Sequence, residues 1–224
     1  MIAGSGRRMW SAGPARRVAG GIVHGALDLR LHFEPGMTVG LFGGSFDPAH
    51  EGHAHVARTA MRRLGLNRLV WLVSPGNPLK RSAPADLARR MAGARAMASD
   101  PRMLVSDAET TLGSRYTIDL VRALQARWPA VRFVWIMGAD SLLDFHKWRG
   151  WTELLEDIPT AIITRPGSAI RSRLAPAARR FAHARLPSSR ARRLAFATTP
   201  AWTFLRAPWH FVSSTELRAK GAAH

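Results

Sequence analysis

The chain has 224 residues, of which 46% are hydrophobic, so it is long enough and apolar enough for one well-packed domain. Lys and Arg number 33 against 15 Asp and Glu, and the formal net charge of +18 favours anionic ligands. There is no cysteine, which excludes disulfides, thiolate metal sites and a cysteine nucleophile. Arg, His or Gly interrupts every apolar run before the roughly 18 to 20 residues that span a bilayer, so we expect a cytoplasmic protein without a membrane partner.

The N-terminal segment is basic and lacks the pattern of a folded domain. It has no acidic residue before Asp28, and glycine and alanine interrupt any helical period. An organellar transit peptide has a similar composition, although the amphipathic pattern is weak in this segment. We therefore predict a flexible basic extension over residues 1–35 and a single domain over residues 36–221.

From Met37 onward, short apolar runs alternate with segments of helical period, a pattern typical of βαβ units in a parallel sheet. Strands are predicted over residues 37–42, 68–73, 103–106, 131–137 and 160–164. Apolar residues at three-to-four spacing predict helices over residues 50–64, 86–98 and 116–128. The whole pattern predicts an α/β fold with a doubly wound parallel sheet of the Rossmann-like kind.

The remainder of the chain is less regular. Residues 171–193 are rich in Ala and Arg and contain Pro176 and Pro187, which predicts a helical or irregular insertion. A last short strand is predicted near residues 210–212. It leads into a helix that begins at Ser213 or Ser214, because both are good N-cap residues.

The first predicted strand runs directly into residues 43–53, which read GGSFDPAHEGH. Gly43 and Gly44 allow an anion to approach backbone N–H groups, and a helix begins near His50. Ligands of open α/β sheets bind outside the carboxyl ends of the strands, where this segment lies. His50 and His53 are three residues apart, so their imidazoles share one side of the first helical turn. The segment predicts a phosphate site; a zinc site, or histidines that only bond neighbouring carbonyls, are the alternatives.

Several segments carry a resemblance to a known family. The run GGSFDPAHEGH resembles the signature of the adenylyltransferase superfamily with the (His/Thr)-x-Gly-His motif, and residues 212–218, VSSTELR, are similar to its second signature, Ile-Ser-Ser-Thr-x-Ile-Arg. Within this superfamily the chain resembles bacterial nicotinate-nucleotide adenylyltransferases, because further motifs recur in order: SPGNPLK, RYTID, GADS followed by FHKW, and TRPG. The match covers roughly Met37 to Lys220.

The resemblance implies the nucleotidyltransferase form of the fold and adenylyl transfer from ATP to nicotinate mononucleotide, which gives deamido-NAD and pyrophosphate. The attacking phosphate is already ionised at neutral pH, so catalysis needs positioning and charge stabilisation and no general base. His50 and His53 then donate hydrogen bonds to phosphate oxygens, while Ser214 and Arg218 hold the departing pyrophosphate. Further ATP and phosphate contacts are expected from Gly43, Gly44, Ser45, Phe46, Lys80, Ser213 and Thr215.

Mg²⁺ is the expected cofactor. It should enter on the ATP phosphates, because this hard cation keeps water and substrate oxygens as ligands and needs few side chains. No protein side chain is therefore expected to ligate the metal. For Lys80, a solvated surface lysine is the alternative to a phosphate contact.

Gly138 and Asp140 follow the fourth predicted strand and are the expected ribose contacts. A small residue permits close approach, a carboxylate accepts a hydrogen bond from a ribose hydroxyl, and the resemblance implies this use. A helix-capping role for Asp140 is the alternative. Arg165 is a further candidate for a contact with a substrate phosphate.

Trp148 is a candidate platform for the pyridine ring, because a large aromatic side chain stacks on a flat heterocycle. Packing in the core is the alternative role for this tryptophan. The resemblance implies that Thr117 and the backbone near Trp148 and Arg149 hold the nicotinate carboxylate.

Two other functions remain open at this point. One is transfer to another acceptor of the same superfamily, phosphopantetheine or a polyol phosphate, against which the Thr117 and Trp148 regions argue. The other is a basic nucleic-acid-binding protein, for which the net charge is the only support, because no RRM, KH or zinc-finger signature is present. We therefore expect ATP and nicotinate mononucleotide as partners and no specific nucleic acid; the sequence leaves the oligomeric state open.

Overall fold

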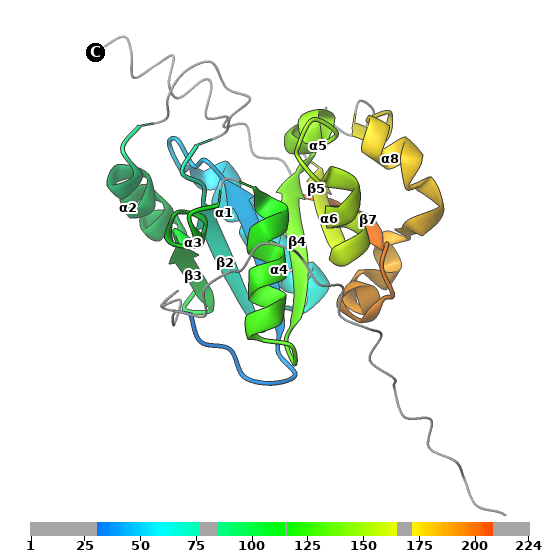
Figure 1. The fold of residues 1–224 in the computed structure, drawn as a ribbon, viewed down its shortest axis with the longest axis horizontal. Helices are drawn as coiled ribbons and strands as arrows, with labels where there is room; N and C mark the ends of the chain where they lie inside the picture. Colours follow the sequence, from blue (N-terminus) through cyan, green and yellow to red (C-terminus); the bar gives the residue numbers. More distant parts are fainter. Residues whose placement is uncertain (1–30, 77–84, 115, 165–171, 208–224) are drawn as a thin grey trace, which may run out of the picture.

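The computed structural model describes residues 31–76, 85–114, 116–164 and 172–207 (Figure 1). Its strands are β1 (Thr38–Gly44), β2 (Arg68–Val73), β3 (Met103–Ser106), β4 (Arg132–Gly138), β5 (Thr160–Thr164), β6 (Arg185–Leu186) and β7 (Trp202–Arg206). Its helices are α1 (Glu51–Leu64), α2 (Leu87–Met97), α3 (Ala108–Leu112), α4 (Thr117–Arg127), α5 (Ala139–Phe145), α6 (Trp151–Asp157), α8 (Pro176–Arg180) and the 3-10 helices η1 (Ala182–Ala184) and η2 (Ser188–Phe196).

The strands form one sheet in the order β3-β2-β1-β4-β5-β7-β6, and all neighbouring strands are parallel. The predicted α/β fold with a doubly wound parallel sheet is confirmed. From β1 the chain proceeds outward through β2 and β3, and from β4 it proceeds in the opposite direction through β5 and β7. The carboxyl ends of β1 and β4 therefore flank the point where the strand order reverses, which is where such sheets bind ligands.

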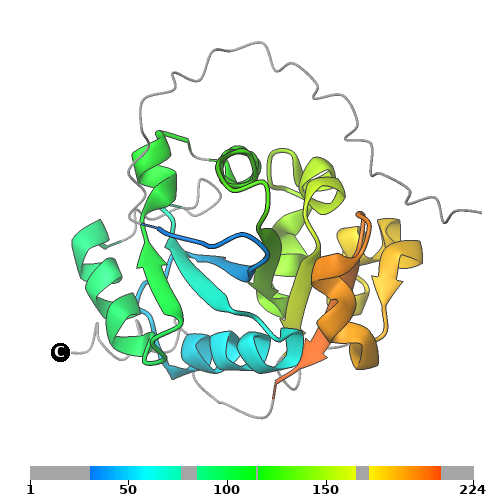
Figure 2. The same ribbon diagram turned by 90° about the horizontal axis from the view of Figure 1, so that it is seen from below.

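Side chains of each strand alternate between two hydrophobic cores, one on each face of the sheet. Along β4, Phe133, Trp135 and Met137 belong to the core under α4, α5, α6 and α8, while Val134 and Ile136 belong to the core under α1, α2 and η2. Figure 2 shows α1 on one side of the sheet and α4 on the other. Each fully buried side chain of this kind contributes about 1.5 to 3 kcal/mol of transfer free energy. The two cores hold the central strands, and hence their carboxyl ends, in fixed positions.

Helix α1 shows how closely the sequence specifies local structure. Ala57, Met61 and Leu64 lie at three-to-four spacing and are buried against the sheet. Gly65 ends the helix in the left-handed region at φ 69°, and the N–H groups of Gly65 and Leu66 both donate to the Met61 carbonyl at 3.1 Å. Helices α2 and α4 likewise lie within one residue of their predicted bounds.

The N-terminal boundary of the domain differs from the prediction. Phe33 was assigned to the extension, but its side chain is only 4% exposed. Its ring lies 5.0 Å from that of Trp128 and 5.8 Å from that of Phe133, edge-on to both. Phe33, together with the partly buried Leu31, therefore packs on the core. Residues 1–30 lie outside the described part.

The C-terminal part also differs. The strand and helix predicted from residues 210–212 and from Ser213 or Ser214 lie outside the described residues, whereas β7 was not predicted. Within the predicted helical or irregular insertion, Pro176 stands in the first turn of α8, where its missing N–H has no cost. The predicted insertion also supplies the two-residue strand β6, which pairs with β7 at the sheet edge. In the described part, no helix is both long enough and apolar enough to cross a membrane.

Candidate active site

Two glycines end β1 beside buried aromatic rings. A methyl group on Gly43 would overlap Cη2 of Trp135 and lie 2.7 Å from its Cζ2, and one on Gly44 would lie 2.9 Å from Cζ of Phe46. Trp135 is 1% exposed and so has no free space into which to move. Phe46 itself has a positive φ of 47°, an uncommon backbone conformation for a bulky residue, as the chain leaves the strand. Residues 43–46, which we call the cradle, thus form a sharply turned segment that packs on buried aromatic rings.

The two predicted histidines stand at the start of α1 and lie against each other. Their ring centroids are 3.9 Å apart with an interplanar angle of 34°. The Gly52 N–H donates to Nδ1 of His50 at 3.0 Å, and the His50 N–H donates to Nδ1 of His53 at 3.3 Å. Because each Nδ1 accepts a hydrogen bond, a neutral ring carries its proton on Nε2. The helix N-terminus therefore orients both imidazoles as Nε2–H donors, which suits a phosphate ligand and does not suit a pair of Nε2 metal ligands.

Aromatic rings fix the plane of His53. The Phe46 ring lies 5.1 Å from the imidazole at 80°, the Phe42 ring lies 6.3 Å away, and Trp71 lies 6.5 Å away. Phe42, Phe46 and Trp71 are all buried and pack on one another. A catalytic donor held by such neighbours loses little freedom when a ligand binds.

The carboxyl end of β4 carries the predicted ribose contacts. Gly138 ends the strand and is the N-cap of α5, and Asp140 is exposed in the first turn of that helix. The N-cap position belongs to Gly138, which has no side chain, and not to Asp140. Asp140 therefore stands beside the end of β4, next to the cradle at the end of the adjacent strand β1.

Trp148 follows α5 and is half-buried. Its ring centroid lies 5.3 Å from that of Phe145 and 6.4 Å from that of Trp135. Trp135 also contacts Gly43, so one buried ring separates the phosphate cradle from Trp148. Both roles considered for Trp148 are compatible with this placement, because part of the ring packs in the core and part remains exposed.

The structure brings Arg149 and Thr117 into one region. Thr117 is the first residue of α4, and the Arg149 guanidinium lies 4.4 Å from the ring centroid of the preceding Tyr116. A methyl on Gly150 would lie 3.1 Å from Cγ2 of Ile118, so the segment after α5 packs closely on the start of α4. The predicted acceptor residues, which are far apart in sequence, are thus neighbours.

Glu109 is a buried carboxyl that the sequence did not single out. It lies in α3 and is 6% exposed. Burial raises its pKa from the ordinary 4.5 to about 7, and a hydrogen bond with the Thr117 side chain acts in the opposite direction. Glu109 therefore supports a residue of the predicted acceptor region and titrates near neutral pH.

Glu109→Gln is expected to stabilise the protein more at about pH 8 than at about pH 5.5. Between about pH 4.5 and about pH 7, the Glu109 carboxyl is protonated in the folded protein and ionised in the unfolded protein, because its pKa rises from 4.5 to about 7 on folding. Folding takes up a proton in this window, so wild-type stability falls as the pH rises through it. The neutral amide of Glu109→Gln does not titrate, so the variant should not show this fall in stability, which is on the order of 1 to 3 kcal/mol.

Urea unfolding of wild type and variant at both pH values measures this difference. Glu156→Gln, at an exposed position of α6, serves as the control for the loss of one carboxylate. An equal effect of Glu109→Gln at both pH values would mean that the buried carboxyl is ionised throughout.

Six of the predicted site residues lie outside the described part of the chain. They are Lys80, Arg165, Ser213, Ser214, Thr215 and Arg218. Within the described ranges, no group of three or more His, Cys, Asp or Glu side chains is placed to hold a metal ion.

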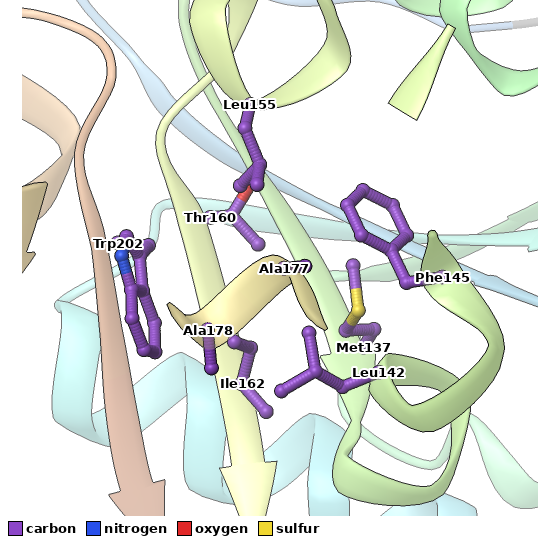
Figure 3. A pocket seen from close by; sticks show the side chains of 9 residues that line it. All are labelled: Met137, Leu142, Phe145, Leu155, Thr160, Ile162, Ala177, Ala178 and Trp202. Atoms are coloured by element: carbon purple, nitrogen blue, oxygen red, sulfur yellow. The ribbon is translucent and has the colours of Figure 1, made fainter. Parts of the chain in front are cut away.

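A small cavity on the core side of α5 and α8 has the wrong chemistry for a nucleotide. Figure 3 shows its lining, which is apolar except for Thr160 and the indole of Trp202. The Thr160 hydroxyl donates to the Ile158 carbonyl at 3.2 Å, and Nε1 of Trp202 donates to the Phe181 carbonyl at 2.6 Å. No polar group remains to orient a ligand, so the cavity is a packing gap of the core.

The chain is similar to proteins of a known family. The family described as cytidylyltransferase-like matches residues 41–220. A protein of Caulobacter sp. (strain K31) named probable nicotinate-nucleotide adenylyltransferase is 63% identical over 185 residues, which cover 82% of this chain and 98% of that protein. A protein of Cereibacter sphaeroides with the same name is 51% identical over 185 residues, or 83% of this chain and 98% of that protein.

The fold is also similar to that of a solved structure, the Plasmodium falciparum nicotinic acid mononucleotide adenylyltransferase complexed with NaAD. The TM-score is 0.58 at 16% identity, over 82% of this chain and 83% of that chain. The range matched by the family begins inside β1 and extends beyond β7, so it includes the whole of the site described above.

Proposed function

Since the chain belongs to the cytidylyltransferase-like family and, within it, to the nicotinate-nucleotide adenylyltransferases, we propose that it transfers the adenylyl group of ATP to nicotinate mononucleotide. The products are deamido-NAD and pyrophosphate. The observation that carries the proposal is the pair of adjacent imidazoles at the start of α1, each oriented as an Nε2–H donor by the hydrogen bond that its Nδ1 accepts.

The reaction makes limited demands on the protein. An oxygen of the mononucleotide phosphate attacks the α-phosphorus of ATP, the bond from that phosphorus to the β-phosphate oxygen breaks, and pyrophosphate leaves with its electron pair. No proton has to be removed from the attacking group. The cradle of Gly43, Gly44, Ser45 and Phe46 and the donors of His50 and His53 would hold the phosphates and stabilise the charge that develops on them.

Mg²⁺ is proposed to enter as the complex with ATP, where it neutralises phosphate charge during the displacement. The described cradle offers backbone N–H groups and imidazole N–H donors, which fit phosphate oxygens and not a bare cation. The metal is therefore expected to take its ligands from water and from ATP.

The acceptor is proposed to bind between the start of α4 and the end of α5. Trp148 would supply the stacking surface, and Thr117 with the backbone at Trp148 and Arg149 would hold the carboxylate. Gly138 and Asp140, beside the cradle, would contact the ribose. The packing of Arg149 on Tyr116 supports this arrangement, because it fixes the two segments relative to each other.

The test is pyrophosphate release by purified protein with ATP, Mg²⁺ and one acceptor at a time: nicotinate mononucleotide, phosphopantetheine or a polyol phosphate. Release with nicotinate mononucleotide is expected. Release with another acceptor alone would overturn the acceptor assignment. No release with any acceptor, together with duplex DNA binding that survives physiological salt, would favour the nucleic-acid alternative, because non-specific binding is lost as salt rises.

A further inference from the structure

Arg90 is a buried arginine in the middle of α2, and it faces the cradle. Its side chain is 3% exposed. Nη1 donates to the Ser45 carbonyl at 2.9 Å and to the Ser74 carbonyl at 2.7 Å, Nη2 donates to the Pro75 carbonyl at 3.3 Å, and Nε donates to the Ala85 carbonyl at 2.8 Å. One guanidinium thus joins the segment after β1, the segment after β2 and the residues before α2.

These bonds hold two adjacent residues of the cradle, Gly44 and Ser45. The Ser74 N–H donates to the Gly44 carbonyl at 3.0 Å, so the chain after β2 is bonded to the last residue of β1 as well as to Arg90. The Ser45 carbonyl points toward the guanidinium. In a planar trans peptide the following N–H points the opposite way, so the Phe46 N–H is directed away from Arg90. Arg90 thereby decides which side of this peptide presents an acceptor and which presents a donor.

Arg90 also carries a charge in this buried position. Its hydrogen-bond partners named above are neutral carbonyls, which satisfy its N–H groups without cancelling its charge. Burial lowers the pKa of the guanidinium, while the Asp47 and Asp86 carboxylates raise it, and an arginine stays protonated in proteins. The Asp47 and Asp86 carboxylates offset part of this positive charge, so Arg90 acts on the cradle chiefly through the geometry of its hydrogen bonds.

We propose that Arg90 is a positioning residue for nucleotide binding: it orients the Ser45–Phe46 peptide so that the cradle presents N–H donors to the ATP phosphates. This inference rests on the proposed use of the cradle for ATP. It assigns to Arg90 a function beyond the stability of the fold.

The test compares Arg90→Lys and Arg90→Met with Arg89→Met, which changes an exposed neighbour on the same helix. Lysine keeps the charge but cannot donate to three segments at once, because it lacks the planar fork. For each variant kcat, the KM for ATP and the KM for nicotinate mononucleotide are measured, together with the Tm with and without ATP and Mg²⁺.

Arg90→Lys is expected to lower kcat/KM for ATP at least about tenfold and to change the KM for the acceptor less than about twofold, since only the cradle is displaced. The rise in Tm caused by ATP should shrink in Arg90→Lys and be smallest in Arg90→Met. Arg89→Met should behave as wild type. If Arg90→Met does not fold, Arg90→Lys alone decides the question.

A lower Tm of Arg90→Lys without ATP, combined with wild-type kinetics and a wild-type response to ATP, would reduce Arg90 to a folding residue and overturn the inference. A wild-type protein that binds ATP but releases no pyrophosphate would instead overturn the proposed function, and the Tm response would still decide the role of Arg90.

Discussion

His53→Ala is expected to lower kcat by about 10²-fold or more while the protein remains folded, the loss typical of removing one preorganised donor from developing charge. The Phe46 ring and the His50 N–H fix the imidazole, so its orientation is set before the substrate binds. The loss should therefore appear mainly in kcat. Steady-state pyrophosphate release measures it, and circular dichroism checks the fold.

Removing this imidazole also removes a cap of α1, since Nδ1 of His53 accepts from the N-cap backbone. The expected cost in stability is about 0.5 to 2 kcal/mol. Rates are therefore compared well below the Tm of the variant. Glu51→Ala is the control. Glu51 is exposed, lies in the same helical turn and forms an ion pair with Arg58 at the surface. Near-normal turnover of folded His53→Ala would end the assignment of His53 as a catalytic donor.

Wild-type enzyme is expected to prefer nicotinate over nicotinamide mononucleotide by at least about 10²-fold in kcat/KM. A pocket that offers only donors satisfies a carboxylate but leaves the NH₂ of an amide facing another donor. Each stranded polar group costs about 1 to 3 kcal/mol, and the loss is larger when the correct ligand is charged. Parallel assays with the two mononucleotides give the ratio directly, and comparable rates would show that the acceptor pocket has been misread.

Two variants test the stacking contact and the carboxylate contact of the acceptor separately. Trp148→Ala should weaken the use of both mononucleotides through lost stacking, whereas Thr117→Val should narrow the ratio between them. Because Thr117 also hydrogen-bonds Glu109, the valine variant is compared with Glu109→Gln, which keeps the Thr117 hydroxyl. If Glu109→Gln narrowed the ratio as much as Thr117→Val, the hydroxyl would act through Glu109 and not on the substrate.

The sequence predicted those parts of the fold in which local signals agree. Strand β2 was predicted at its exact bounds because one apolar run is flanked by polar and turn-forming residues. Helix α1 was predicted well because its apolar period ends at Gly65. Strand β7 was missed because Pro200 and Pro208 divide the C-terminal apolar residues into competing runs, and only pairing with β5 and β6 selects Trp202–Arg206.

In the site, too, the residues with a local sequence signal were predicted and those set by tertiary contacts were not. The cradle and its histidines are contiguous in sequence, so a motif revealed them. Arg90 acts through partners such as Ser45 in another part of the chain, and Glu109 acts through Thr117 in the next helix, and no motif indicates such contacts. One signal was available: Arg90 occupies the stripe of α2 that otherwise holds Leu87, Met91 and Ala94, and a charged residue on a buried face calls for a partner.

The contact of Trp135 with both Gly43 and Trp148 limits how this protein can diverge. Position 43 admits a side chain only if the indole at 135 is replaced by a smaller ring. That replacement in turn removes one of the two rings against which Trp148 packs, the other being Phe145. In related sequences, substitutions at these three positions are therefore expected to occur together and not singly.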